Sequence, residues 1–367
     1  MIRVLHIVGS MDRNGLQSFI MNVYRNIDRD KVQFDFVEFR SEPCEYDSEI
    51  ESLGGKIYRL PSKSSHFYKC INSIRKIVKD NKYQIVHRHY YSSTMVFELL
   101  AAKLGGAKTL IAHSHSTRAL SRAYLHYIFR PLLSGVATRK IACSEEAGKW
   151  MYGKRRFLIF RNGISYETFR YNSIVREKIR DELQISDSFV IGNVARFEKV
   201  KNHVFMINLI ERYVKRNQNA KLLLVGNGND YNRIKDLVKE RKLDKYTLFV
   251  GSKSNGSDYL QAFDAFILPS LYEGIPLTLI EAQVNGLKCI VSENVDKTVN
   301  ITGNISFLGI AESDLDKWCY ELDNVRDNDT RYIISEDAFI KTGYSSKSIT
   351  EDLQNLYEDL AKGDNNV

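Results

Sequence analysis

The sequence predicts an α/β protein built from two doubly wound parallel sheets, one in each of two domains. Three observations support this prediction. The chain has 367 residues, which is more than one ordinary α/β core accommodates. Short apolar runs typical of buried strands alternate with helical segments along most of the chain. The alternation is interrupted once, at Asn162-Gly163-Ile164, and then resumes.

The first alternating series predicts an N-terminal Rossmann-like domain over residues 1–168. Ile2–Val8 has the pattern of a strand, Gly9–Gly15 that of a loop, and Leu16–Ile27 that of an amphipathic helix. The polar stretch Ser165–Arg180 is interpreted as the interdomain linker. Further strands are expected at 33–39, 56–59, 84–87, 108–113, 138–143 and 157–160, with helices at 67–80, 92–104 and 144–152.

The second series predicts a C-terminal Rossmann-like domain over residues 169–340. Strands are expected at 189–194, 221–225, 247–250, 265–268 and 288–292, with helices at 202–217, 231–241, 257–263 and 277–285. Ligands of such sheets bind beyond the carboxyl ends of the strands, so a ligand cleft between the two domains is predicted. The last segment, 341–367, contains an amphipathic helix, Ser346–Ala361, which is expected to pack back on the first domain.

Composition indicates a soluble globular protein. Hydrophobic residues make up 43% of the chain, and no apolar run approaches the 18 residues that a membrane-spanning helix needs. The five cysteines have no paired spacing, which favours free thiols in a reducing compartment and a cytoplasmic location. The N-terminal apolar run is too short for a signal peptide.

Charge is unevenly distributed along the chain. The net charge is +8, and residues 113–180 hold 14 Lys/Arg against 4 Asp/Glu, whereas residues 311–367 hold 6 against 14. A basic segment indicates an anionic partner, which leaves nucleic acid, an anionic bilayer or a phosphorylated substrate open, beside a merely solvated face. Nucleic acid is the least favoured because the segment has no aromatic stacking pattern and no recognisable module.

The unit from Ala265 to Ser292 reads as strand, loop, helix and strand. Pro276 falls where its helix begins, and the free amides of Leu277, Thr278 and Leu279 would form a site for a phosphate or diphosphate. Glu273 precedes that helix and Glu281 lies on it, eight residues later. One carboxylate can then reach a group beyond the phosphates while the other faces a ribose. The alternative is two solvated glutamates.

Other candidate residues follow strands. Arg196 and Lys201 come just after the 189–194 strand and are placed to clamp a diphosphate, unless they are exposed loop residues. Gly226-Asn-Gly228 resembles the start of a dinucleotide fingerprint but lacks its third glycine. The pairs His87/His89 and His113/His115 suggest a metal site, neutral hydrogen-bonding histidines or buried structural histidines. No carboxylate or cysteine at ligand spacing accompanies them, which disfavours the metal.

Taken together, these stretches resemble the retaining glycosyltransferases of family 4, which have the two-domain GT-B fold. The resemblance implies that the first domain lies on the acceptor side and that the second binds the nucleotide-sugar donor. The stretch Pro269-Ser-Leu-Tyr-Glu273-Gly-Ile-Pro-Leu-Thr-Leu-Ile-Glu281 is similar to that family's signature. Asn193-Val-Ala-Arg196 through Lys201-Asn, Arg161-Asn-Gly-Ile164 and Ile85-Val-His-Arg-His89 appear in family order. The residues after Leu287 look most like the branch that builds bacterial capsular polysaccharides and exopolysaccharides.

The resemblance implies retaining transfer of a hexose from a nucleotide donor, with UDP as the expected nucleotide, to a glycan or lipid-linked saccharide. No metal or other cofactor is expected. Arg196 and Lys201 would bind the diphosphate with the backbone of Ile275, Leu277 and Thr278. Glu281 would hold the ribose, Glu273 and His113 would meet the donor sugar at the reacting centre, and Gly15 would let its loop approach the phosphates.

One departure from the family and two alternatives accompany this prediction. The family often has Gly-Gly-x-Glu where this chain has Asn14-Gly15-Leu16-Gln17, so an acceptor contact from this loop is in doubt. The basic segment suggests peripheral attachment to the inner face of the cytoplasmic membrane through Arg118, Arg122 and Arg130. The alternatives are a UDP-sugar epimerase with the same fold and a non-catalytic partner subunit of another glycosyltransferase.

Overall fold

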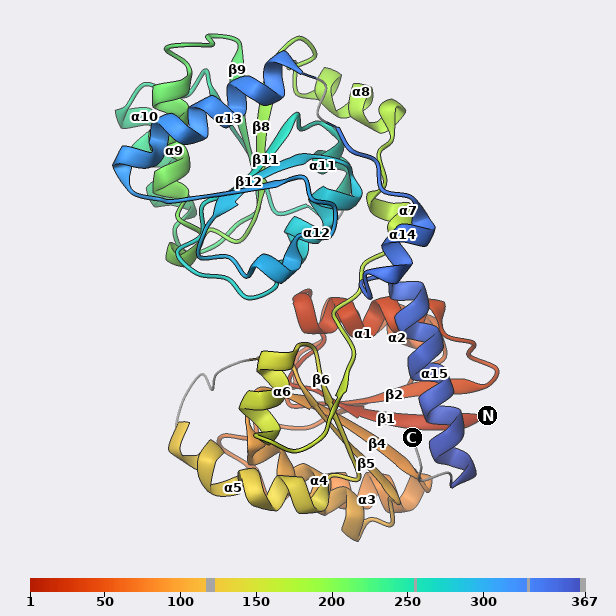
Figure 1. The fold of residues 1–367 in the computed structure, drawn as a ribbon. Coiled ribbons are helices and arrows are strands. Elements are labelled where there is room, and N and C mark those ends of the chain that lie inside the picture. Colours follow the sequence, from red (N-terminus) through yellow and green to blue (C-terminus); the bar gives the residue numbers. More distant parts are fainter. Residues whose placement is uncertain (117–122, 254–255, 329–330, 364–367) are drawn as a thin grey trace. The chain divides into compact units, whose positions relative to one another are not determined.

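The computed structural model describes residues 1–116, 123–253, 256–328 and 331–363. They form two compact units (Figure 1). The first unit comprises Met1–Gly163 together with Gly343–Val367, and the second comprises Ile164–Thr342. The predicted boundary at 168/169 lies five residues beyond the first of these divisions.

The first unit contains a seven-stranded parallel sheet in the order β3-β2-β1-β4-β5-β6-β7. Its order reverses between β1 and β4, which marks the switch point of a doubly wound sheet. The strands are β1 (Ile2–Ile7), β2 (Val32–Glu38), β3 (Ile57–Arg59), β4 (Ile85–Tyr90), β5 (Thr109–Ser114), β6 (Arg139–Ala142) and β7 (Leu158–Ile159).

The second unit contains a six-stranded parallel sheet in the order β10-β9-β8-β11-β12-β13, with its switch point between β8 and β11. Its strands are β8 (Phe189–Val194), β9 (Ala220–Val225), β10 (Thr247–Gly251), β11 (Ala265–Leu268), β12 (Lys288–Ser292) and β13 (Ile305–Leu308). The two sheets confirm the predicted fold class.

Helices connect the strands in both units. In the first unit they are α1 (Gly15–Asn26), α2 (Asp47–Ser52), α3 (Phe67–Asn81), η1 (Ser93–Met95), α4 (Val96–Leu104), α5 (Ala123–Val136), α6 (Glu145–Tyr152) and α15 (Ser346–Lys362). In the second they are α7 (Tyr166–Phe169), α8 (Ser173–Glu182), η2 (Lys199–Lys201), α9 (His203–Tyr213), α10 (Tyr231–Glu240), α11 (Gly256–Gln261), α12 (Leu277–Val284), η3 (Lys297–Val299), η4 (Glu312–Asp314), α13 (Leu315–Asp327) and α14 (Glu336–Lys341).

The C-terminal helix α15 packs on the first unit, beside α1 and over β1, β2 and β4 (Figure 1). Its apolar face supplies Ile349, Leu353, Leu356, Tyr357 and Leu360 to a core cluster shared with α1 and β2. Burial of such a face is what holds an amphipathic helix in place. The first unit therefore depends on residues from both ends of the chain.

The stretch interpreted as a linker, Ser165–Arg180, is structured. It forms α7 and most of α8, and both helices belong to the second unit. Asn172 caps α8 by accepting from the amides of Ile174 and Val175. Arg176 and Arg180 of α8 both form ion pairs with Asp264, just before β11. The polar character of this stretch thus reflects anchoring contacts to the second sheet.

Candidate active site

Two loops meet at the switch point of the second sheet. One follows β8 and contains Arg196 and Lys201, and the other follows β11 and contains Glu273. Backbone hydrogen bonding joins them, because the amide of Leu271 donates to the carbonyl of Val200 at 2.8 Å. The carboxyl edge at a switch point is where open α/β sheets bind ligands. The structure thus brings these predicted residues to one place within this unit.

Lys201 and Glu273 form an ion pair across these loops. Both side chains are largely buried, with 18% and 16% of their surface exposed. The hydroxyl of Ser270, which is fully buried, donates to the same Glu273 carboxylate at 3.1 Å. These contacts hold the ammonium group and the carboxylate in one position at the edge of the sheet.

Arg196 is exposed and pairs with Glu198 at 3.1 Å. Its loop is supported from β9 by Gly226, where a Cβ atom would lie 2.0 Å from the carbonyl oxygen of Ala195. The amide of Phe197 also donates to the carbonyl of Asn227 at 3.0 Å. The Gly-Asn-Gly stretch therefore serves close packing of two loops, which accounts for it without a dinucleotide.

The helix α12 begins directly after Pro276, as predicted. The amide of Leu279 donates to the carbonyl of Pro276 at 3.0 Å, so the prediction that it is free for a phosphate is wrong. Leu277 and Thr278 remain in the first turn, where amides have no partner within the helix. Both are half-buried, as is Ile275.

Burial raises the pKa of Glu281, on α12, to about 7. A carboxylate in an apolar environment resists ionisation. Hydroxyl groups that donate to it would offset this cost, because they favour the charged form.

In the first unit, Gly15 opens α1 and is exposed, with no atom within 4 Å of the place where a Cβ would lie. The neighbouring Gln17 turns inward, and its side-chain amide donates to the carbonyl of Ser10 at 2.9 Å. The loop thus has space at Gly15, while Gln17, which replaces the family's glutamate, is held by the backbone of Ser10.

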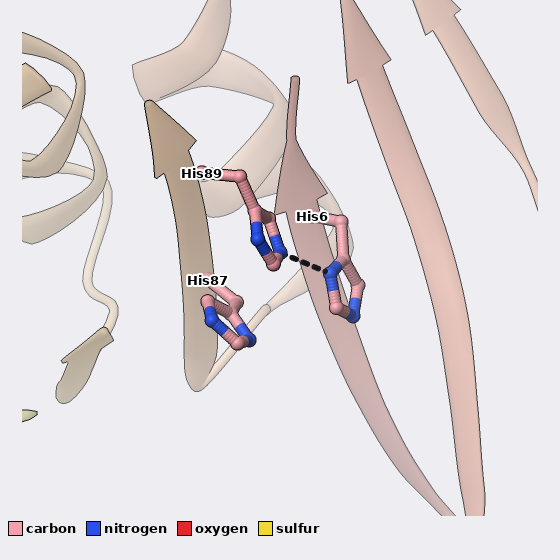
Figure 2. A group of neighbouring side chains, drawn as sticks. All are labelled: His6, His87 and His89. Atoms are coloured by element: carbon pink, nitrogen blue, oxygen red, sulfur yellow. Dashed lines mark hydrogen bonds between the residues drawn. The ribbon is translucent and has the colours of Figure 1, made fainter. Parts of the chain in front are cut away.

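Five histidines, four on strands of the first sheet and His115 just after β5, form two hydrogen-bonded rows that lie against one another. In the first row His6 Nδ1 lies 3.0 Å from His89 Nε2 (Figure 2). His89 Nδ1 in turn lies 3.0 Å from His115 Nε2. In the second row Tyr357 of α15 lies 2.7 Å from His87 Nδ1, and His87 Nε2 lies 3.1 Å from His113 Nδ1.

Burial holds these histidines in the neutral form. It lowers the pKa of His6 and of His115 to about 3, and in His115 the side chain of Asn162 opposes the fall. It lowers the pKa of His87, His89 and His113 well below the usual value. A neutral imidazole has one donor and one acceptor, so each ring can link two neighbours.

The predicted sugar contact His113 is fully buried, whereas His115, two residues on, is half-buried. His113 Nε2 and His115 Nδ1 have no partner among the described residues. Sequence reasoning singled out the two His-x-His pairs but missed His6 and Tyr357. The apolar pattern around His6 and the helical spacing of Tyr357 indicated only core positions.

Among the described residues, three clusters have three potential metal-ligand atoms within 4.8 Å of one another. Two lie in the histidine rows, as His6/His87/His89 and His89/His113/His115, and the third is Glu38/Cys44/Asp47. In the third cluster, burial and then Asp47 raise the pKa of Glu38 to about 7. Ring nitrogens within the histidine rows already bond one another. The absence of a metal requirement therefore stays a prediction.

A basic cavity of about 920 Å³ lies in the first unit, around the start of β6 and the loop before β7. Its basic residues far outnumber its one acid, Glu145; they are Arg139, Lys140, Lys149, Lys154, Arg155 and Arg156. Two guanidinium nitrogens of Arg139 are buried without a partner among the described residues. Burial, followed by repulsion from Arg155 and Arg139, lowers the pKa of Lys140. Lys149 pairs with Glu145 at 3.4 Å, whereas the other five basic residues have no ion pair among the described residues.

Comparison with known proteins identifies the class. The model of "Glycosyltransferase Family 4" matches residues 13–165, and that of "Glycosyl transferases group 1" matches residues 175–304. The chain is also 33% identical, over 381 aligned positions, to the putative glycosyltransferase EpsF of Bacillus subtilis, covering 99% of this chain and 98% of that protein. The chain therefore belongs to glycosyltransferase family 4, as predicted.

Two further relatives have names that specify a reaction or a pathway. The capsular polysaccharide biosynthesis glycosyltransferase CapH of Staphylococcus aureus is 27% identical and covers 82% of this chain and 84% of its own. A UDP-Gal:α-D-GlcNAc-diphosphoundecaprenol α-1,3-galactosyltransferase of Escherichia coli is 26% identical and covers 80% of this chain and 79% of its own.

Solved structures share the fold. A glycosyltransferase from Rickettsia africae superposes with a TM-score of 0.80 at 16% identity, covering 98% of this chain and 99% of that one. HepE from Anabaena, in complex with UDP, gives 0.76 at 13% identity, covering 98% and 100%. The predicted GT-B fold is thus confirmed.

Proposed function

We propose that this glycosyltransferase moves a hexose from UDP to a lipid-linked saccharide during synthesis of a bacterial surface polysaccharide, with retention at the anomeric carbon. The observation that carries the proposal is the largely buried Lys201–Glu273 ion pair at the switch point of the second sheet. The cation is suited to a phosphate and the carboxylate to sugar hydroxyls. Because the two groups are in contact, they suit a ligand in which a sugar is joined to a diphosphate. The names of the E. coli and S. aureus relatives support the donor and the pathway.

In this proposal, the protein stabilises charge on the leaving UDP. Lys201, Arg196 and the first-turn amides of α12 would face the diphosphate, where negative charge develops as the sugar leaves. Preorganised donors of this kind stabilise such a transition state without a metal ion. Glu281 would bind the ribose, and Glu273 the hydroxyls of the sugar.

The test is a transfer assay with a panel of UDP-hexoses and an undecaprenyl-diphosphate-linked sugar as acceptor. We expect one donor to be consumed, with product whose anomeric configuration by NMR equals that of the donor, and with a rate unchanged by EDTA. Inverted product would contradict the retaining mechanism, and loss of activity in EDTA would contradict metal independence. Interconversion of UDP-sugars without acceptor would instead establish the epimerase alternative.

We also propose that the first unit contacts anionic membrane. Four large apolar residues of α5 are 45–62% exposed and lie at helical spacing; they are Tyr124, Tyr127, Ile128 and Leu132. Arg130 of the same helix lies near Gly153, which lines the basic cavity. An apolar stripe beside uncompensated positive charge suits the interface of an anionic bilayer. Of the predicted contacts, Arg118 and Arg122 lie outside the described residues.

Flotation with liposomes tests this contact. We expect the protein to float with vesicles containing phosphatidylglycerol at low salt, and not with pure phosphatidylcholine. Ile128→Ser and the pair Lys154→Glu/Arg155→Glu should each abolish flotation, whereas Lys76→Glu/Lys79→Glu on α3 should not. Equal flotation with neutral vesicles would contradict the proposal. In the part of the chain that the structure describes, no helix has the length and apolarity to cross a bilayer.

A further inference from the structure

The row Tyr357–His87–His113 has one hydrogen-bond donor more than it can use. Each of its three groups is neutral and has one hydrogen to donate, because burial raises the pKa of Tyr357 well above 10 and lowers those of the histidines. Two hydrogen bonds link the three groups. One hydrogen is therefore left over, either on the hydroxyl of Tyr357 or on Nε2 of His113.

The surroundings of the two ends differ. Tyr357 is fully buried between aromatic rings, with Phe34 at 5.8 Å and His6 at 6.4 Å between centroids, both edge-on. Among the described residues, the Tyr357 hydroxyl has no hydrogen-bond acceptor other than His87. His113 occupies the penultimate position of β5, next to the carboxyl edge of the sheet, where ligands of parallel sheets bind. Nε2 of His113 is buried too and has no partner among the described residues. A phenol O–H is a stronger hydrogen-bond donor than a neutral imidazole N–H, so Tyr357 is the better donor to His87, and the spare hydrogen then lies on His113.

We infer that Tyr357 and His87 are positioning residues that hold His113 with its proton on Nε2. Tyr357 donates to His87 Nδ1, so His87 carries its proton on Nε2 and donates to His113 Nδ1. His113 then presents Nε2–H as a donor to an oxygen of the bound substrate. The inference rests on the proposed function only in this last step.

Metal coordination explains the arrangement of these histidines less well than hydrogen bonding does. The rows stack, with His87 on His89 at 4.1 Å and 24°, and His113 on His115 at 4.0 Å and 31° between ring planes. Stacked rings direct their nitrogen lone pairs side by side. A zinc ion requires lone pairs that converge on one point at about 2.0–2.1 Å. Hydrogen bonding within each row satisfies the rings as they stand.

Nitrogen-15 NMR of histidine-labelled full-length protein tests the tautomer directly. We expect His113 to show a protonated Nε2 and an unprotonated Nδ1, and Tyr357→Phe to shift it toward the opposite tautomer. The matched control is Tyr24→Phe, which removes another buried hydroxyl of the same core that bonds Gln33 and touches no histidine nitrogen. A proton on Nδ1 of His113 in the natural protein, or no change in Tyr357→Phe, would overturn the inference. So would stoichiometric bound metal, measured by elemental analysis, that shifts these signals.

Kinetics separate positioning from simple stabilisation. We expect Tyr357→Phe to lower kcat by about fivefold, the size of one neutral hydrogen bond, with KM for the donor unchanged. Tyr24→Phe should lower the melting temperature comparably but leave kcat unchanged. If the natural protein transfers no sugar, the proposed function fails, while the NMR result still decides the tautomer.

Discussion

At the residue scale, Lys201 and Glu273 determine the proposed chemistry. They lie 72 positions apart, and contact between them is a product of the β8 and β11 loops. Lys201→Met keeps most of the side chain and removes the charge that would face the diphosphate. We expect UDP affinity, measured by calorimetry, to fall by at least about tenfold, or about 1.4 kcal/mol. Lys199→Met, in the same turn but exposed, is the control and should bind UDP normally.

Glu281 makes binding depend on pH. Its pKa is raised to about 7 by burial, so near neutral pH a large share of the side chain is protonated. Ribose hydroxyls that donate to the carboxylate favour its ionised form, so UDP affinity should rise between pH 6 and pH 8 and then level off. Because the phosphates of UDP also titrate near pH 6, the readout is the difference from Glu281→Gln, which should lack this rise. Equal pH profiles would contradict the assignment.

At the element scale, the loops that follow β8 and β9 pack closely on one another and shape the site. A Cβ on Gly226 would collide with the backbone at Ala195, next to Arg196. Overpacking of this kind costs about 1–3 kcal/mol, so Gly226→Ala should lower the melting temperature by roughly 2–12 °C and weaken UDP binding. Gly256→Ala, where a Cβ meets nothing, should be neutral. An unchanged melting temperature in Gly226→Ala would show that this loop contact is dispensable.

Elements differ in how well the sequence predicted them. Apolar runs located the core strands closely, because buried parallel strands are hydrophobic on both faces. The edge strand β13 was missed, since most of its residues are only half-buried. The helix α8 was read as linker because its polar surface hides two arginines that bind Asp264. Loop spacing located Lys201 and Glu273 separately. Their contact, and that of Tyr357 with His87, depends on tertiary packing that no local pattern contains.

At the scale of the whole molecule, the chain returns to its first unit through α15. This helix buries five large side chains in that unit's core, each worth about 1.5–3 kcal/mol, and their sum rivals the 5–15 kcal/mol that stabilises a typical domain. A chain ending at Tyr344 should therefore lose the first unit's structure. The second unit, 164–342, contains none of these residues and should remain folded.

Hydrogen exchange with mass spectrometry distinguishes the two units in this truncated chain. We expect rapid exchange in β1, β2 and β4, with protection retained in β8 and β11. UDP should still slow exchange at the loops after β8 and β11, because Arg196, Lys201 and Glu281 all belong to the second unit. A chain that ends at Lys362 keeps α15 and serves as the control. Loss of UDP protection in the shorter chain, despite a folded second unit, would show that nucleotide binding needs the first unit as well.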